Sequence, residues 1–215
     1  LSFIGIPASI LVFLLMLYSA VNRLLKPLDP ELTTILSKLP KGYALILIPG
    51  IDPMLPLIQG WIALIISVTL HEFFHGLVAI NHGRSLASVG LMIPFGAFAK
   101  VIDARPGDLR IYSAGITVNL LISITAFSIL AMVKPLPEIF LKNPLTLLAP
   151  IDILRLKGID ISLTFSESIL YYIGLVNIWL FIINSIPFLI TDGTYILTGI
   201  LTHFTKLKRA IIISQ

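Results

Sequence analysis

Three ionisable residues within five positions are the part of the sequence best suited to chemistry. They occur in the segment HEFFH at residues 71–75, inside a long apolar run. Residues four apart on a helix share a face, so His71 and His75 could bind one metal ion. Glu72 lies beside them, where its carboxylate could hold a metal-bound water and act as general base. This spacing is the H-E-x-x-H pattern of zinc hydrolases and predicts a Zn2+ site on a helix.

A catalytic zinc ion usually takes three protein ligands, so the two histidines need a partner. Asp192 is the candidate, because it follows an apolar run that Pro187 should break and precedes Gly193, which allows a tight turn. An acid in so apolar a setting is a functional candidate by default. The alternative is a plain helix N-cap, since Asp-Gly here precedes the apolar stretch Thr-Tyr-Ile-Leu.

The elements that must position these residues are membrane helices. Hydrophobic residues make up 57% of the 215 residues and charged residues 12%, whereas soluble domains carry about 25% charged residues. Apolar runs long enough to span a bilayer cover about 2–21, 57–80, 111–133 and 168–186. We therefore predict an all-α, multi-pass integral membrane protein of about four transmembrane helices, located in the cell membrane.

The remaining composition narrows the chemistry further. The formal net charge is +4, but the basic residues lie at the ends of apolar runs, where they anchor to lipid headgroups. The partner expected for this charge is therefore the lipid bilayer, and no nucleic acid. The sequence contains no cysteine, which excludes disulfides, thiol catalysis and cysteine-ligated metals.

The chain divides into three parts. Residues 1–56 form an N-terminal transmembrane helix and an interfacial segment, because the apolar piece 44–51 is too short to span. Residues 57–205 form the catalytic transmembrane core. Residues 206–215 are a basic tail or the start of a further helix. Between the third and fourth helices, we expect short helical turns on the surface over 145–156, interrupted by Pro150.

Residues 89–101, VGLMIPFGAFAKV, differ from the helices around them. Gly90, Pro94 and Gly96 disfavour a helix, and the length suits a short hairpin or re-entrant loop. Such backbone is tolerated at membrane depth only where protein or water satisfies its polar groups. We therefore predict a re-entrant β-hairpin near the active site.

Polar residues distant in sequence should reach similar depths in the bilayer. Counting about 1.5 Å per residue from one face, His71 lies at about 21 Å, Asn184 at about 24 Å and Asn119 at about 18 Å. All three positions lie beyond the bilayer centre. Asn119 could donate to the developing oxyanion or to the substrate backbone. It could equally make an interhelical hydrogen bond with no catalytic part.

Together these residues resemble the site-2 protease family of intramembrane zinc metalloproteases. The matching segments are HEFFH at 71–75, GITVN at 115–119, PFGAF at 94–98, and the Asn-x-x-Pro…Asp-Gly pattern of Asn184, Pro187, Asp192 and Gly193. The resemblance covers about residues 57–200. Two positions depart from the family pattern, Leu189, where a second proline is frequent, and Thr191, where a hydrophobic residue is usual.

The resemblance implies a function and a role for each matched residue. The protein would hydrolyse peptide bonds within transmembrane segments of membrane protein substrates, in regulated intramembrane proteolysis. Zinc would be bound by His71, His75 and Asp192, and Glu72 would activate water. Substrate would be bound by Asn119, Asn184 and the hairpin residues Gly96, Ala97 and Phe98. The linker 134–167 is too short for the PDZ domain that many members carry there, so no PDZ domain is expected.

Two alternatives use the same motif differently. A prenyl-protein protease also has H-E-x-x-H, but is expected to use a downstream glutamate as third ligand, and Glu138 and Glu167 lie in a polar linker. A non-enzymatic membrane metal-binding protein, such as a transporter, usually shows repeated polar helices or inverted repeats, which this sequence lacks. The intact Glu72 also argues against an inactive enzyme.

Overall fold

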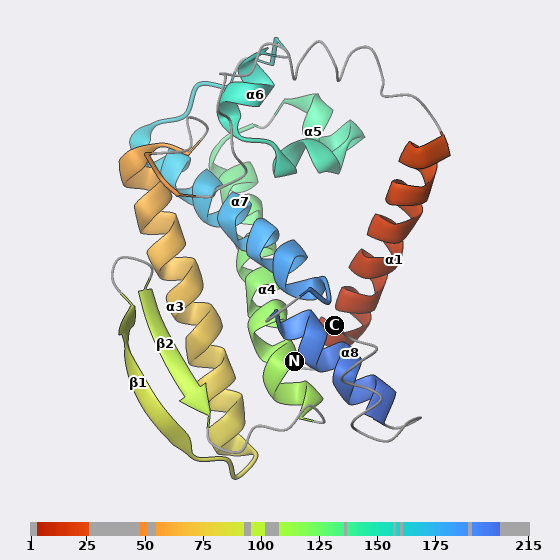
Figure 1. Cartoon of the computed structure of the whole chain (residues 1–215). Helices are drawn as coiled ribbons and strands as arrows, with labels where there is room; N and C mark the ends of the chain where they lie inside the picture. The colour runs from red at the N-terminus through yellow and green to blue at the C-terminus, as the bar shows by residue number, and fades with distance from the viewer. Residues whose placement is uncertain are drawn as a thin grey trace.

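The structure is a computed structural model that describes residues 4–25, 48–50, 55–92, 96–101, 108–135, 137–156, 158–159, 161–188 and 191–202. It is mainly helical, with one small antiparallel sheet (Figure 1). The elements are α1 (Gly5–Leu25), α3 (Leu57–Asn81), β1 (Leu86–Met92), β2 (Gly96–Val101), α4 (Leu109–Val133), α5 (Glu138–Lys142), the 3-10 helix η1 (Pro144–Leu148), α6 (Ile151–Leu156), α7 (Phe165–Ser185) and α8 (Asp192–Thr202).

Three of the described helices, α3, α4 and α7, are long and apolar enough to cross a membrane. They correspond to three of the four predicted spans, which confirms the prediction of a mainly helical chain with membrane-length helices. The first predicted span forms α1, whose apolar part in the described residues, Gly5–Leu15, is shorter than a membrane span. The tail 206–215 and most of the interfacial segment 44–51 lie outside the described residues.

Local sequence signals set both ends of α7. At its start, Thr164 Oγ1 accepts from the backbone N–H of Glu167, and Glu167 Oε2 accepts from the backbone N–H of Thr164 at 2.8 Å. This capping box begins the helix three residues before the predicted position at 168. The helix ends at Ser185, because a proline at 187 keeps the chain from continuing as a helix. The break expected before Pro187 is therefore confirmed.

The three membrane-length helices pack side by side and share one core (Figure 1). Its buried residues include Ala63 and Leu64 of α3, Leu130 of α4, and Leu175 and Val176 of α7. Hydrogen bonds between helices add to this packing, as polar side chains commonly do between membrane helices. Asn177 of α7 donates to Ser67 Oγ of α3 at 2.6 Å, and Ser123 of α4 donates to the Gly174 carbonyl of α7 at 2.9 Å.

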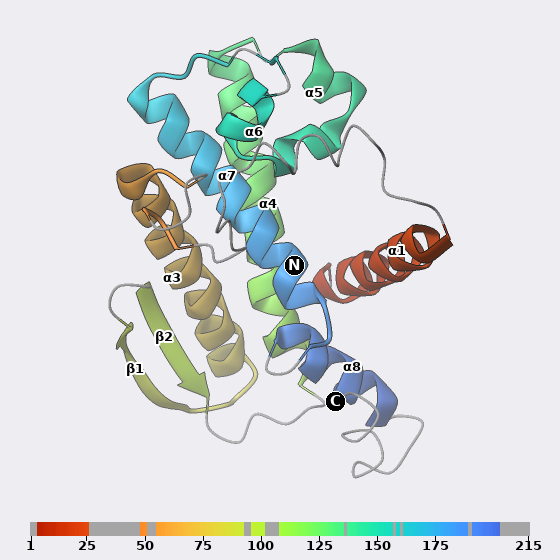
Figure 2. The ribbon, with the colours of Figure 1, turned by 45° about the horizontal axis from the view of Figure 1, so that its top comes forward.

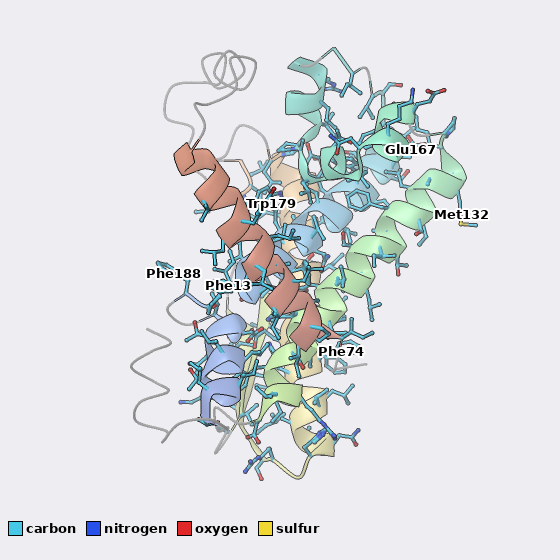
Figure 3. The ribbon with its side chains drawn as sticks, turned by 90° about the vertical axis from the view of Figure 1, so that its right-hand side faces the viewer. Phe13, Phe74, Met132, Glu167, Trp179 and Phe188 are labelled. Carbon is cyan, nitrogen blue, oxygen red and sulfur yellow. The ribbon has the colours of Figure 1, made fainter. Side chains whose placement is uncertain are left out.

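The linker between α4 and α7 folds over one end of this bundle (Figure 2). It forms the predicted short helical turns, with Pro150 between η1 and α6. They are not confined to the surface, because Ile151 and Leu154 are buried in the core. Two aromatic side chains fasten the linker to α7: the Tyr171 hydroxyl donates to the Ala149 carbonyl at 2.6 Å, and Trp179 Nε1 donates to the Leu148 carbonyl at 3.0 Å. Figure 3 shows Trp179 among the helices, whereas Met132 points outward from α4.

The segment predicted as a hairpin forms two antiparallel strands that lie along α3, with β2 between α3 and β1 (Figure 1). Paired residues run from Leu86 opposite Val101 to Met92 opposite Gly96, and a bulge interrupts the ladder at Ala87. Residues 93–95, which include Pro94, lie outside the described residues. The antiparallel pairing is confirmed, whereas the re-entrant position relative to a membrane stays a prediction.

Candidate metal centre

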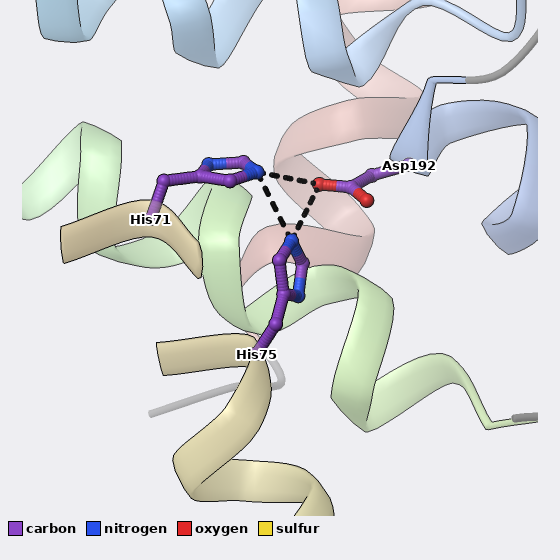
Figure 4. A group of neighbouring side chains, drawn as sticks. All are labelled: His71, His75 and Asp192. Carbon is purple, nitrogen blue, oxygen red and sulfur yellow. Dashed lines mark hydrogen bonds and ion pairs between the residues drawn. The ribbon is translucent and has the colours of Figure 1, made fainter. Parts of the chain in front are cut away.

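The two motif histidines lie on one face of α3, and both are buried. Their Nε2 atoms are 3.0 Å apart. Asp192 Oδ2, at the start of α8, is 3.2 Å from His71 Nε2 and 3.1 Å from His75 Nε2 (Figure 4). Ligands at about 2.0–2.1 Å around a tetrahedral zinc ion lie about 3.3 Å apart, so the spacing of these three atoms suits such an ion.

Asp192 lies close to the end of α7, because Thr191 beside it is hydrogen-bonded to the residues that follow that helix. Thr191 Oγ1 donates to the Ile186 carbonyl at 2.5 Å and accepts from the Phe188 backbone N–H at 3.2 Å. A side chain on Gly193 would place its Cβ 2.6 Å from the Ser185 carbonyl oxygen, so glycine is needed at this close approach. Asp192 lies in the first turn of α8 with its carboxylate on the histidines, which supports the metal-site interpretation over a plain N-cap.

Space for both imidazoles comes from Gly115 on α4. A Cβ at this position would lie 2.5 Å from His71 Cε1 and 2.5 Å from His75 Nε2. Any side chain larger than hydrogen would therefore occupy the place of the rings. This glycine, the first residue of the GITVN segment, thus makes room for the histidines directly.

Each histidine also has a partner for its second ring nitrogen. His75 Nδ1 is 2.7 Å from the Ile111 carbonyl, an acceptor, so Nδ1 carries a proton and Nε2 is the nitrogen that can bind a metal ion. Such hydrogen bonds from the far nitrogen are usual for metal-binding histidines. The tautomer of His75 therefore suits metal binding.

For His71, this partner is Asn119 of α4, which is 0% exposed. Its Nδ2 faces His71 Nδ1 at 2.9 Å, and its buried Oδ1 has no hydrogen-bond partner among the described residues. Metal binding through Nε2 requires a proton on Nδ1 and hence an acceptor facing it. Turning the amide by 180° places Oδ1 there, which gives the orphaned oxygen a donor and His71 the required tautomer. The contact is interhelical, as one of the two alternatives for Asn119 expected.

Glu72 lies next to the three clustered atoms without joining them. It lines a cavity of about 270 Å³ together with His75 and Asp192. Its Oε2 also accepts from the Ala99 backbone N–H of β2 at 3.4 Å. The carboxylate thus lines a cavity large enough for water beside the candidate metal ligands, where a general base is needed.

Two tyrosines that sequence reasoning missed complete the wall of this cavity. Tyr112 of α4 and Tyr195 of α8 stack with ring centroids 4.5 Å apart and an interplanar angle of 10°. Tyr195 follows Asp192 by three residues and so shares its helix face, which is the signal that could have found it. Nothing in the sequence around Tyr112 pairs it with Tyr195.

The other predicted substrate residues belong to the hairpin and to α7. Ala97 of β2 donates its backbone N–H to Thr69 Oγ1 of α3 at 3.2 Å, so this strand edge faces the motif helix. Gly96 and Phe98 are half-buried beside it. Asn184 is half-buried near the end of α7 and is not among the described residues that line the cavity beside the histidines.

A His-His-Asp cluster with an adjacent glutamate, whose buried histidines lie on the membrane-length helix α3, defines a membrane protein with a candidate metallohydrolase-type centre. Residues 59–213 match peptidase family M50. The chain belongs to this family, the site-2 protease family.

The chain is also similar to an uncharacterised protein, MJ0971, of Methanocaldococcus jannaschii, with 32% identity over 123 residues. The similar region covers 53% of this chain and 34% of that protein. The chain thus spans about a third of the length of this relative. No solved structure matches the chain significantly.

The close approach at Gly115 gives a test of the centre. Gly115→Ala should displace both imidazoles, because overpacking at a rigid contact moves side chains off their positions. We expect the variant to lose most of its bound zinc, measured by elemental analysis of purified protein. Ala126→Gly, which perturbs the same helix away from the histidines, should keep its zinc. Full occupancy in Gly115→Ala would contradict the described packing.

The orientation of Asn119 gives a second test. Asn119→Leu removes the acceptor and should weaken zinc affinity by about 10–100-fold, the usual effect of losing a partner of a metal-binding histidine. Asn119→Asp keeps an acceptor facing His71 Nδ1 and should retain affinity, measured by competition with a chromophoric chelator. If the amide instead donates to His71, the aspartate variant should lose as much affinity as the leucine variant.

Proposed function

We propose that this protein is an intramembrane zinc metalloprotease that cleaves peptide bonds within transmembrane segments of membrane protein substrates. The observation that carries the proposal is the spacing of His71 Nε2, His75 Nε2 and Asp192 Oδ2. The two histidines lie on α3, a membrane-length helix that packs against two others, α4 and α7. Membership of peptidase family M50 supports it. We further propose a multi-pass protein of the cell membrane, with α1 as a fourth span and 57–205 as the catalytic core.

In this proposal His71, His75 and Asp192 hold the zinc ion and the other residues handle water and protons. Zinc, when bound, polarises the scissile carbonyl and makes water a stronger nucleophile. Glu72 takes the proton of the attacking water and passes it to the leaving amine. The cavity of about 270 Å³, whose wall includes the exposed Lys100, supplies the polar route by which water reaches Glu72.

The edge of β2 that faces α3 is the proposed docking place for the substrate backbone. Ala97 and Ala99 direct their N–H groups at Thr69 and Glu72 of α3. A helical substrate hides its carbonyls in its own hydrogen bonds, so it must unwind before cleavage. An unwound segment would take over these two donors by strand addition. Asn119 acts in this proposal through His71, and Asn184 stays a proposed substrate contact.

The alternative third ligand of a prenyl-protein protease finds no support in the described residues. Glu138 lies on α5, where Lys142 bonds it at 2.9 Å. Glu167 caps α7 and lies 3.5 Å from Lys134. Both side chains are thus engaged in the linker region, whereas Asp192 contacts both histidines.

Two substitutions separate metal binding from proton transfer. Glu72→Gln should keep zinc and lower the cleavage rate by about 10²–10⁴-fold, because the general base is lost. Asp192→Asn keeps the size but removes the charge, so zinc occupancy and cleavage should both fall. Zinc content and cleavage of a membrane-segment substrate in detergent would be measured together. Near-normal cleavage by Glu72→Gln would refute the mechanism, and normal zinc content in Asp192→Asn would refute the ligand assignment.

Strand addition predicts the effect of a proline on the edge of β2. Ala97→Pro removes an N–H that faces α3 and not β1, so it should block cleavage without changing zinc content. The control is Ala87→Pro, since Ala87 is exposed at the bulge of β1 and pairs with no residue of β2. Cleavage by Ala97→Pro at the rate of the control would remove this edge from substrate handling.

A further inference from the structure

A second cavity lies between α3 and the hairpin, on the other side of Glu72. Its volume is about 250 Å³, and its walls include Phe73 and Leu77 of α3, Val89 of β1 and Phe98 of β2. We propose that this pocket, here called the side-chain pocket, binds one apolar side chain of the substrate, from a residue next to the scissile bond. The inference rests on the proposed function and adds a substrate preference to it.

The side-chain pocket directly adjoins the cavity of about 270 Å³ beside His75 and Asp192, here called the catalytic cavity. Glu72 and Ala99 line both spaces, and the Ala99 N–H donates to Glu72 Oε2 between them. The catalytic cavity also contains His75 and Asp192. A peptide bond held at the candidate metal ligands therefore has a neighbouring side chain within reach of the pocket. Successive side chains of an extended strand point to opposite faces, so only one of the two flanking residues can enter.

The lining selects by polarity. Among the described residues that line the pocket, only Thr69 and Glu72 have polar side chains, and both already accept backbone N–H groups of β2. An acidic side chain in the pocket would be desolvated beside the Glu72 carboxylate, which is unfavourable. A leucine-like or phenylalanine-like side chain meets no such penalty. The pocket therefore favours apolar residues and rejects acidic ones.

The size and the openness of the pocket point to a side chain as occupant. Its volume lies below the range of about 300–1,000 Å³ typical of small-molecule sites. Leu77 and Val89 are 46% and 67% exposed, so the pocket also opens outward. A lipid acyl chain is as apolar as leucine and would gain little by entering. A substrate side chain differs because the catalytic cavity holds its backbone alongside.

Peptide hydroxamates provide the probe, because the hydroxamate group binds zinc while one side chain samples the neighbouring space. Three would be compared on the zinc-loaded full chain in detergent, with isobutyl, hydrogen or carboxymethyl at the tested position. We expect the isobutyl compound to bind at least about 10-fold more tightly than the other two, because a single methylene group in an apolar pocket changes binding by about 10–200-fold. Affinity would be measured by calorimetry.

Two variants of Leu77 test whether a preference for the isobutyl compound arises from the side-chain pocket. Leu77→Trp should fill it and remove the isobutyl preference, while leaving the affinity of the hydrogen compound unchanged. Leu77→Ala should widen it and shift the preference toward a phenylethyl side chain. Ile124→Trp, an exposed position on α4 outside the lining, is the control and should change neither.

The outcomes distinguish this inference from the proposed function. If no hydroxamate binds the zinc-loaded protein, or no zinc is bound, the proposed function fails. If all three compounds bind equally, or the variants of Leu77 change all three alike, only the side-chain pocket is refuted. A photoreactive acyl chain that labels residue 77 equally with and without saturating isobutyl compound would also refute it, by assigning the pocket to lipid.

Discussion

The structure depends on keeping two imidazoles and a carboxylate together among apolar helices. Isolated polar groups in such a setting are costly, and each must find partners. Here the partners come from other elements: the Ile111 carbonyl and the Asn119 amide from α4, and the Asp192 carboxylate from α8. Gly115 lets α4 come close enough to supply them. The requirement to satisfy the histidines thus explains why α3, α4 and α8 meet where they do.

The same requirement explains the hairpin. A strand edge exposes N–H groups that must be satisfied wherever water is scarce. In β2 these groups are satisfied by Thr69 and Glu72, side chains of the motif helix. The proposed catalytic base and the proposed substrate-binding edge are therefore partners of each other in this structure. A substrate strand that takes the Ala99 N–H would at the same time release Glu72 for proton transfer.

Much of this arrangement could be predicted from the sequence because its signals are local. The four-residue spacing of His71 and His75, the length of the apolar runs and the helix break at Pro187 each depend only on neighbouring residues. What could not be predicted depends on how helices rotate against one another. The contact of Asn119 with His71 and the stacking of Tyr112 on Tyr195 join residues 48 and 83 positions apart, and no local pattern specifies them.

The register between α3 and α7 determines whether the centre can form. The histidines lie on α3, whereas Asp192 begins α8, and a hydrogen bond from Thr191 to the Ile186 carbonyl ties α8 to the end of α7. A shift of α7 along α3 by one helical turn would move Asp192 by about 5.4 Å, beyond the reach of a shared metal ion. The buried hydrogen bond from Asn177 to Ser67, at 2.6 Å, opposes such a shift. Because a shift would break this buried hydrogen bond between the two helices, this contact away from the centre helps fix the distance between its ligands.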